Sequence, residues 1–162
     1  MSFADSVDEL AGLLVDAVNA NASVGFHKPL RREDALSFWR ALRAEVVDGR
    51  TVVLVAEIDG RIVGTVQLRL AQFPNGRHRA EVAKLLVHSD ARRHGIGRAL
   101  MTDLERVART QARTLLVLDT VTGSDADRLY RSLGWTFVGE IPGYAEHPDG
   151  PRPTSYFYKE VR

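Results

Sequence analysis

The feature that most constrains the fold is a basic, glycine-containing turn between a predicted strand and a predicted helix. Residues 80–87, AEVAKLLV, have the apolar and β-branched character of a strand. An apolar stripe of helical period begins at Ile96, directly after the turn, and continues for about 15 residues. Residues 114–120, TLLVLDT, form a nearly continuous apolar run that is typical of a strand buried on both faces. This order predicts a strand–helix–strand crossover whose two strands are parallel.

The segments around this crossover predict further helices and strands. These are helices over 6–20 and 32–47, strands over 51–58 and 61–70, a short helix from Ser124 to Gly134, and strands over 135–141 and 154–161. Asp59 and Gly60 predict a two-residue hairpin turn, and the Pro/Gly-rich segment 142–153 predicts a loop. The fold class is therefore α/β, or α+β with a mixed sheet. Without repeats, low-complexity tracts or long linkers, the sequence predicts one domain over residues 1–162.

Charge and residue inventory exclude several classes of function. The 162 residues include 22 Lys and Arg and 21 Asp and Glu, so the net charge of +1 gives no sign of a nucleic-acid partner. The absence of cysteine excludes a disulfide framework, a thiolate metal site and a cysteine nucleophile. The five histidines show no zinc-binding spacing, so no metal is expected. The acidic N-terminus is unlike a secretory signal and no apolar run is long enough for a membrane span, so we expect a cytoplasmic protein without a membrane partner.

The basic turn has the features of a phosphate-binding site. The first N–H groups of a helix have no partner within it, and the helix dipole adds partial positive charge there. Gly95 and Gly97 leave room for an anion to approach these groups, and Arg92, Arg93 and Arg98 add full charges nearby. The alternative is a strand-to-helix loop whose glycines only relieve strain and whose arginines are solvated.

Two common phosphate-binding motifs do not fit this turn. Leu100 occupies the third glycine position of the dinucleotide motif Gly-x-Gly-x-x-Gly, and only Asp119 could supply the acidic residue expected at the end of the next strand. The Gly-Lys-Ser/Thr of a nucleoside triphosphate-binding loop is absent. Neither a dinucleotide site nor such a loop is therefore predicted.

The segment ARRHGIGRALM resembles the acetyl-CoA-binding motif of the GNAT superfamily of N-acetyltransferases, Arg/Gln-x-x-Gly-x-Gly/Ala. Arg92, Gly95 and Gly97 occupy the specified places. LYRSLGW at 129–135 is similar to the family's segment after its fifth strand. Short strings along the chain, including ASVGF, PNGRHRAEVAKLLV and VGEIPGY, resemble the tabtoxin-resistance-protein branch. The resemblance implies the GNAT acyl-CoA N-acyltransferase fold, in which helices flank a mixed sheet that is splayed between two parallel strands.

The resemblance also implies that acetyl-CoA lies between the strands 80–87 and 114–120, with its pyrophosphate on the amides of the turn. The pantetheine arm would pair with the backbone of 85–87 like a short extra strand. Ser124 would lie on the far side of the arm, where many family members carry an asparagine. The predicted cofactor-binding residues are Leu85, Leu86, Val87, Arg92, Arg93, His94, Gly95, Ile96, Gly97, Arg98, Ala99 and Ser124.

Acetyl transfer from a thioester to an amine requires removal of a proton from the amine, stabilisation of an oxyanion and protonation of the leaving thiolate. Because the chain has no cysteine, the simplest scheme is direct attack in a ternary complex. By resemblance, Tyr130 is the general acid, and a phenol with a pKa of about 10 stays protonated at neutral pH. The alternative for Tyr130 is a core tyrosine with a satisfied hydroxyl.

Glu81 and Asp119 are open alternatives for the base. Glu81 lies six residues before Val87, or roughly 20 Å along a strand, so it would meet the reactive end of the cofactor rather than its phosphates. Asp119 is the sole charge in TLLVLDT and lies at the end of a strand where α/β proteins form their sites. In the branch that the chain resembles, the same two acids are suggested as the base. A water chain is the third alternative, because a carboxylate with a pKa of about 4 is a weak base toward an ammonium.

The resemblance implies a small-molecule primary amine as the acceptor, such as tabtoxinine-β-lactam or another amino-acid-like compound, and hence a role in toxin or antibiotic resistance. By family architecture, Phe26, Trp39 and the 142–153 loop would enclose the acceptor, and His147 lies in this loop. A peptide or protein amine is an alternative acceptor, and a non-catalytic CoA-binding regulatory module is an alternative function. A homodimer is compatible with the resemblance, although the sequence shows no interface pattern.

Overall fold

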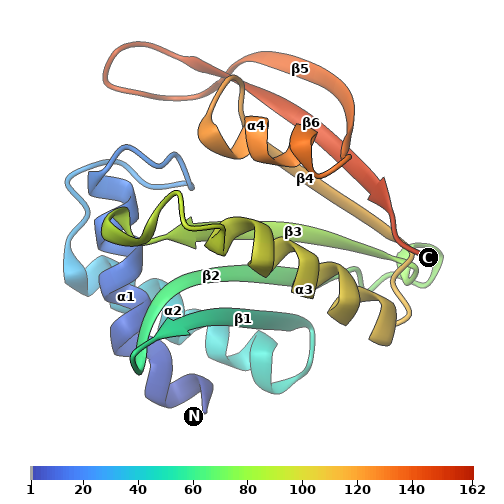
Figure 1. The fold of residues 1–162 in the computed structure, drawn as a ribbon, viewed down its shortest axis with the longest axis horizontal. Helices are drawn as coiled ribbons and strands as arrows, with labels where there is room; N and C mark the ends of the chain where they lie inside the picture. Colours follow the sequence, from blue (N-terminus) through green and yellow to red (C-terminus); the bar gives the residue numbers. More distant parts are fainter. Residues whose placement is uncertain (1) are drawn as a thin grey trace.

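A six-stranded mixed sheet organises residues 2–162, the part of the chain that the computed structural model describes (Figure 1). The elements are α1 (Phe3–Asn19), α2 (Arg32–Val47), β1 (Thr51–Ile58), β2 (Arg61–Leu70), the short turn η1 (Pro74–Gly76), β3 (Arg79–Val87), the short turn η2 (Ser89–Ala91), α3 (Ile96–Thr110), β4 (Leu115–Val121), α4 (Asp125–Ser132), β5 (Thr136–Ala145) and β6 (Arg152–Glu160). The strand order across the sheet is β1-β2-β3-β4-β6-β5. β3 and β4 are parallel and the other neighbouring strands are antiparallel. The predicted mixed α/β fold and the parallel crossover through α3 are confirmed.

Helices cover both faces of the sheet and create two apolar cores. α3 and α4 pack on one face, where Met101 and Leu104 are buried in a cluster that includes Leu68 of β2. α1 and α2 pack on the other face around Leu10 and Trp39. Full burial of each large apolar side chain contributes about 1.5–3 kcal/mol to folding, so each face is anchored by several such contributions. None of the helices in the described chain has the length and apolar character that a membrane crossing requires.

β3 and β4 separate after a short paired stretch. Their register pairs 79–81 with 115–117, and the described strands are not paired with each other beyond these positions. β3 also contains a bulge, because one residue of β2 between Thr65 and Gln67 faces two residues of β3. Lys84 lies in this bulge with a φ of +53°. In Figure 1 the two strands converge near the C-terminus and diverge toward the start of α3, so the splay that the resemblance implies is present.

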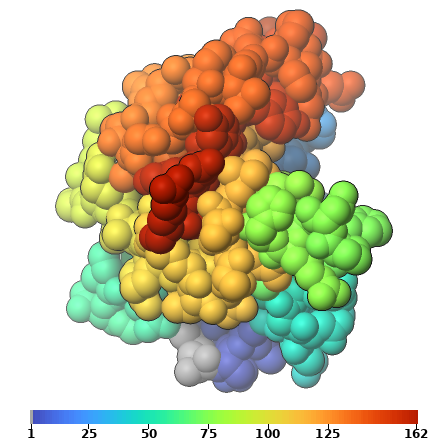
Figure 2. Space-filling view, turned by 90° about the vertical axis from the view of Figure 1, so that its right-hand side faces the viewer, coloured from blue at the N-terminus to red at the C-terminus, as the bar shows by residue number. Residues whose placement is uncertain are grey.

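The C-terminal segment fixes the closed end of the sheet. The N–H of Val161 donates to the carbonyl oxygen of Thr114 at 2.9 Å, and the N–H of Thr114 donates to that of His78 at 2.8 Å. Arg109 Nε donates to the carbonyl oxygen of Arg162 at 2.6 Å. Figure 2 shows this end, where the red C-terminal segment lies against the yellow surface at the end of α3. Because these bonds hold β3 and β4 together here, the strands open only at the opposite end.

The final hairpin is longer than the sequence predicts. β5 and β6 extend into the predicted 142–153 loop and leave only 146–151 as their connection, so the predicted loop is wrong in its bounds. β5 is an edge strand, and an edge tolerates Pro142 because its missing N–H is not needed by a neighbour. Gly143 has a φ of +62° where the pairing of β5 with β6 is irregular.

The first helix starts earlier than the sequence predicts. α1 begins at Phe3 rather than near residue 6. Ser2 Oγ accepts a hydrogen bond from the N–H of Asp5 at 3.3 Å, and Asp5 Oδ2 accepts one from the N–H of Ser2 at 3.0 Å. This reciprocal capping box satisfies two backbone donors and starts the helix before its apolar stripe begins.

Candidate active site

The backbone between β3 and α3 presents a row of N–H groups without partners. The first intrahelical bond of α3 runs from the N–H of Ala99 to the carbonyl oxygen of Gly95 at 3.0 Å. Among residues 2–162, no acceptor takes a hydrogen bond from the N–H groups of 92–98. Gly95 is the N-cap of the helix and has no side chain that could occupy these groups. A helix N-terminus with free amides binds anions.

The two glycines of the turn have different physical roles. A Cβ built at Gly95 meets no atom within 4 Å, but the φ of +79° at this position disfavours any residue with a side chain. A Cβ built at Gly97 would lie 3.2 Å from Leu129 Cδ2 and 3.9 Å from Val87 Cγ2. Gly97 therefore lets α3 approach α4 closely, whereas Gly95 shapes the turn and leaves open space beside it.

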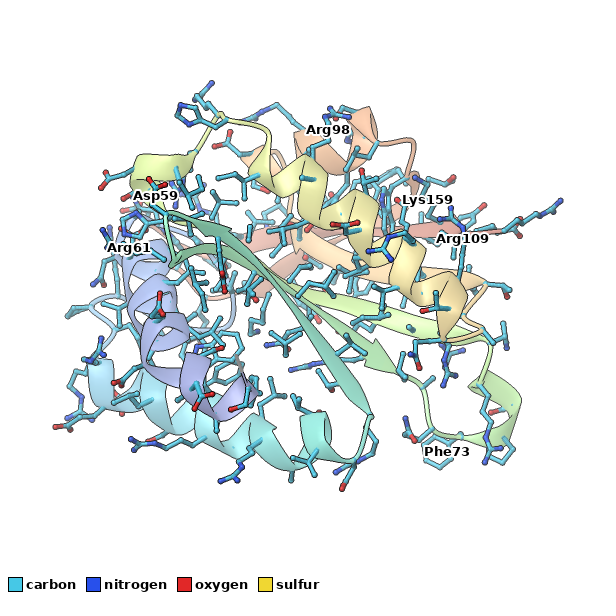
Figure 3. The ribbon with its side chains drawn as sticks, turned by 60° about the horizontal axis from the view of Figure 1, so that its bottom comes forward. Asp59, Arg61, Phe73, Arg98, Arg109 and Lys159 are labelled. Atoms are coloured by element: carbon cyan, nitrogen blue, oxygen red, sulfur yellow. The ribbon has the colours of Figure 1, made fainter. Side chains whose placement is uncertain are left out.

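Basic side chains surround the turn. Arg92 is half-buried, and its Nε donates to the carbonyl oxygen of Val87 at 3.2 Å. Arg98 lies at the start of α3 and donates to Ser132 Oγ of α4 at 2.9 Å (Figure 3). Within the described residues, neither of these arginines nor Arg93 pairs with a carboxylate. The turn therefore keeps positive charge that no side chain compensates.

Next to the turn, the separated strands leave backbone groups available on two facing edges. β3 beyond Glu81 and β4 beyond Val117 are not paired with each other in the described structure. The predicted arm-binding residues Leu85, Leu86 and Val87 lie on this stretch of β3. An extended ligand that carries its own amides can bond to such an edge as an added strand does. The structure therefore places a turn with free amides and arginine side chains beside an open strand edge.

A comparison with known families identifies this arrangement. The acetyltransferase (GNAT) family matches residues 16–135. The chain belongs to the GNAT family. The matched range contains the turn, both separated strands and α4, so the match and the geometry concern the same part of the chain. The GNAT family and the fold that the sequence predicts are confirmed.

Curated relatives carry the same family activity in their names. The chain is 41% identical to N-acetyltransferase 8 of Rattus norvegicus over 90 residues, which are 53% of this chain and 40% of that protein. It is 35% identical to N-acetyltransferase 8 of Homo sapiens over 88 residues, which are 53% of this chain and 39% of that protein. The chain thus spans about two fifths of the length of the curated relatives that it matches.

Solved structures share the fold over nearly the whole chain. The ribosomal-protein-alanine N-acetyltransferase of Brucella melitensis has a TM-score of 0.82 and 26% identity over 99% of this chain and 97% of its own. The structure of yncA from Salmonella typhimurium, which contains its cofactor acetyl-CoA, has a TM-score of 0.80 and 20% identity over 100% of this chain and 91% of its own. At this identity, the second similarity shows the GNAT fold alone.

Tyr130 is held on α4 by aromatic packing. Its ring centroid lies 5.9 Å from that of Trp135 and 6.2 Å from that of Phe157, and the residue is 5% exposed. Its hydroxyl has no hydrogen-bond partner in the described chain. The hydroxyl oxygen is not fully buried, so it keeps some accessible surface. Burial raises the pKa of Tyr130 far above its ordinary value, and the negative charge of Asp119 raises it further. The ring is a core group, whereas the hydroxyl stays protonated and free.

Glu81 and Asp119 lie on the same face of the sheet, opposite to α3. The register places Glu81 beside Val117, and Asp119 is two residues further along β4 and hence on the same face. Both carboxylates are exposed, because the strands separate after this pair. Asp119 accepts a hydrogen bond from Thr154 Oγ1 at 3.2 Å. On this face β4 is not fully buried, so the prediction of a strand buried on both faces is wrong.

Sequence reasoning missed a polar cluster on this same face. Gln67 and Arg69 of β2 point to the side that bears the two carboxylates. Lys84 Nζ lies 6.0 Å from the ring centroid of Phe26 and 5.7 Å from that of Phe38. Burial lowers the pKa of Lys84, and the charge of Arg69 lowers it further. The available signal was a charge inside the apolar strand AEVAKLLV and alternating polar residues in RIVGTVQLRL.

Ser124 fixes the start of α4. Its Oγ accepts a hydrogen bond from the N–H of Asp127 at 3.2 Å and lies 3.3 Å from Thr120 Oγ1. Asp127 Oδ2 accepts from the N–H of Gly123 at 2.7 Å, so the carboxylate closes the turn before the helix. These bonds define the path from β4 into α4. The predicted contact of Ser124 with the cofactor stays a prediction.

A pocket of about 440 Å³ lies between the α1–α2 connection and the β5–β6 connection. It is lined by His27, Glu146, His147, Pro148 and Pro151. A smaller neighbouring pocket shares His27 and His147 with it and is also lined by Phe26 and Lys28. Trp39 is 0% exposed and packs between Phe3 and Phe38, so it supports the core instead of lining either pocket.

Proposed function

We propose that the chain transfers the acetyl group of acetyl-CoA to a primary amine of a small molecule. The observation that carries the proposal is the row of unpartnered N–H groups at 92–98 beside the open edge of β3. Free amides, arginine charge and a splayed strand pair suit a pyrophosphate with an amide-containing arm. In the reaction, the amine nitrogen bonds to the acetyl carbon, the carbon–sulfur bond breaks, and CoA leaves as the thiol after a proton reaches its sulfur.

The turn would hold the pyrophosphate chiefly through its backbone. Open space beside Gly95 gives the anion access to the amides, and Arg92, Arg93 and Arg98 would add charge-assisted hydrogen bonds. The N–H of Ala99 is already bonded within the helix, so this residue would contribute only its exposed side chain.

Tyr130 would act on the leaving sulfur. Its free hydroxyl is the supporting observation, because a hydroxyl that already donates to another acceptor has no proton left to offer the sulfur. A thiol has a pKa of about 8.5, far below that of the buried phenol, so complete transfer of the phenolic proton is unfavourable. Tyr130 would therefore stabilise the sulfur mainly as a hydrogen-bond donor. The proton that the amine gives to a carboxylate or to water would then reach the sulfur through solvent and complete the thiol.

Glu81 and Asp119 would receive the proton of the amine, directly or through water. Both are exposed on the face of the sheet opposite to α3, which we call the acceptor face. An exposed carboxylate exchanges protons with solvent readily, which supports a relay. Glu81→Gln and Asp119→Asn distinguish between the two acids.

The size of the pocket between the α1–α2 and β5–β6 connections supports a small acceptor. A volume of about 440 Å³ falls within the range of about 300–1,000 Å³ that is typical of small-molecule sites. An amino-acid-like toxin or antibiotic of the tabtoxinine type is the finer form of this proposal. A protein N-terminus is the second candidate, because the 26% identical Brucella melitensis structure is a ribosomal-protein-alanine N-acetyltransferase.

Thiol release from acetyl-CoA tests the proposal. The purified chain would be offered amino acids, simple amines and short peptides that begin with alanine, and acetyl-CoA binding would be followed by calorimetry. We expect acetyl-CoA to bind and small amines to release thiol faster than the peptides. Faster turnover of the alanine peptides would establish the second candidate. Binding without thiol release from any amine would indicate the non-catalytic module, and the absence of binding would overturn the proposal.

We further propose that residues 2–162 act as one domain in the cytoplasm. Both apolar cores lie on one continuous sheet, which supports a single folding unit. A chain without cysteine suits a reducing compartment.

A further inference from the structure

Two cationic side chains on the acceptor face lack an acidic partner. Arg69 of β2 and Lys84 of β3 form no ion pair within residues 2–162, and their charged groups make no hydrogen bond there. We propose that Arg69 and Lys84 together bind a carboxylate of the acceptor, which is then an amino-acid-like zwitterion that carries both an amine and a free carboxylate. This inference rests on the acetyltransferase function proposed above and names the class of its acceptor.

Arg69 is held in a position where an anion would complete its contacts. It stands opposite Thr51 on one side and Glu81 on the other, in the middle of three paired strands. Its side chain is half-buried, and its Nε is fully buried without a partner. The buried Nε has lost water without gaining a partner, which is unfavourable. A carboxylate that accepts hydrogen bonds from the terminal nitrogens of the guanidinium would compensate its positive charge.

Lys84 brings a second charge to the same place. The bulge of β3 gives it a φ of +53°, and its Nζ lies over the rings of Phe26 and Phe38. Burial and the charge of Arg69 both lower its pKa, which shows that the two cations repel each other in a partly desolvated setting. An anion between them would remove the repulsion.

Gln67 is a further polar side chain without a partner on this face. It is 0% exposed, and neither Oε1 nor Nε2 has a partner in the described chain. It lies two residues before Arg69 on the same face of β2, opposite Ala83 of β3. Buried side-chain amides are normally satisfied, so the unpaired amide of Gln67 adds an unsatisfied polar group to the face of β2 that carries Arg69.

The acceptor face also offers the complementary charge. Glu81 stands opposite Arg69 in register, and both Glu81 and Asp119 act on the pKa of Lys84 in the direction that favours its charged form. The two protein carboxylates proposed to act on the amine of the acceptor therefore lie within electrostatic reach of Lys84, one of the two cations proposed to bind its carboxylate. Phe26 contacts Lys84 and also lines the smaller pocket, so it connects the polar cluster with the loops around the acceptor.

This arrangement separates the two candidate acceptors. A free amino acid presents both an amine and a carboxylate. The first residue of a peptide or protein has its carboxyl group in an amide bond and offers no carboxylate to either cation. Simple amines lack the carboxylate as well.

Matched acceptors test the inference. Thiol release would be measured with each common amino acid and with its carboxamide, which has the same amine and lacks the negative charge. We expect kcat/KM to be at least about tenfold higher for the preferred amino acid than for its amide. Arg69→Gln and Lys84→Gln should each raise KM for the amino acid by about 10- to 100-fold, as expected for hydrogen bonds to a charged group, and affect the amide far less.

Arg61→Gln is the matched control, because Arg61 is an exposed arginine at the other end of β2 (Figure 3). Arg61→Gln should leave kcat/KM unchanged for both the amino acid and its amide. The unfolding temperature and the Kd for acetyl-CoA establish that the variants are folded, and Lys84→Gln decides alone if Arg69→Gln does not fold. Equal kcat/KM for the amino acid and its amide would contradict the inference, and so would equal losses of kcat/KM for both acceptors in the variants. In either case thiol release would still support the proposed acetyltransferase function. The absence of thiol release with every acceptor tested would contradict both the acetyltransferase function and the inference about its acceptor.

Discussion

Gly97 of α3 lies directly against Leu129 of α4: a Cβ at Gly97 would stand 3.2 Å from Leu129 Cδ2. Leu129 precedes Tyr130, so the turn that would bind the pyrophosphate and the residue proposed to act on the sulfur are in contact through these two helices. Arg98 adds a second link through its hydrogen bond to Ser132. A change at Gly97 should therefore affect both cofactor affinity and the position of Tyr130.

Gly97→Val should weaken acetyl-CoA binding and destabilise the fold. The added branch overpacks the contact with Leu129, which typically costs about 1–3 kcal/mol of unfolding free energy. The Kd for acetyl-CoA should rise by about tenfold or more, as measured by calorimetry, and the unfolding free energy should fall in urea titration. Gly139→Val is the control, because a Cβ at Gly139 meets no atom within 4 Å and the residue lies far along the chain in β5. Unchanged affinity in Gly97→Val would contradict the proposed cofactor site.

Tyr130→Phe should lower turnover far more than cofactor affinity. Loss of a positioned proton or hydrogen-bond donor typically costs about 100-fold or more in rate. The ring contacts with Trp135 and Phe157 remain, and the lost hydroxyl has no partner in the described chain, so stability should be nearly unchanged. Steady-state thiol release gives kcat, and calorimetry gives the Kd. Tyr158→Phe, at an exposed tyrosine of β6, should match the wild type. A kcat for Tyr130→Phe within twofold of the wild type would remove the role assigned to Tyr130.

The raised pKa of Tyr130 predicts a loss of stability at alkaline pH. In the unfolded chain the phenol titrates near 10, whereas the folded state holds the proton to higher pH. The contribution of the protonated phenol to the free energy of unfolding is fully present below pH 10. Above pH 10 only the unfolded chain releases this proton, so the free energy of unfolding falls by up to about 1.4 kcal/mol per pH unit. Urea unfolding at pH 9 and pH 11 should show a steeper fall for wild type than for Tyr130→Phe. Identical slopes would show that the folded environment does not retain this proton.

Strong local patterns made much of the fold predictable. The predicted bounds 32–47, 51–58 and 61–70 coincide with α2, β1 and β2, because helical or strand character there is continuous and a turn or polar segment marks each end. The glycine turn was predictable because Gly95 serves a backbone conformation that few other residues adopt. The extent of the last hairpin was not predictable, because Pro and Gly usually signal a loop. Pro142 is acceptable in β5 only because this strand lies at the edge of the sheet.

The polar cluster of the acceptor face lay beyond sequence reasoning for a different reason. Strand alternation shows that Gln67 and Arg69 share a face, but it does not show which helices cover that face or which strand is the neighbour. The bulge that places Lys84 over two aromatic rings depends on the pairing of β2 with β3, where one residue opposes two. Glu81 and Asp119 were found as separate acids, and only the register of β3 and β4 brings them to one face.

Glu81→Gln and Asp119→Asn should identify the acid that accepts the proton of the amine. Replacement of the true base should lower kcat at neutral pH by about 100-fold, and the rate should recover as rising pH deprotonates the amine in solution. Asp119→Asn should also lower the pKa of Tyr130, because the charge of Asp119 contributes to its elevation. Glu57→Gln, an exposed acid on β1, is the control. If each single variant keeps most of the activity and the double variant loses it, a water relay served by both carboxylates is established; if the double variant also keeps its kcat, neither acid takes part.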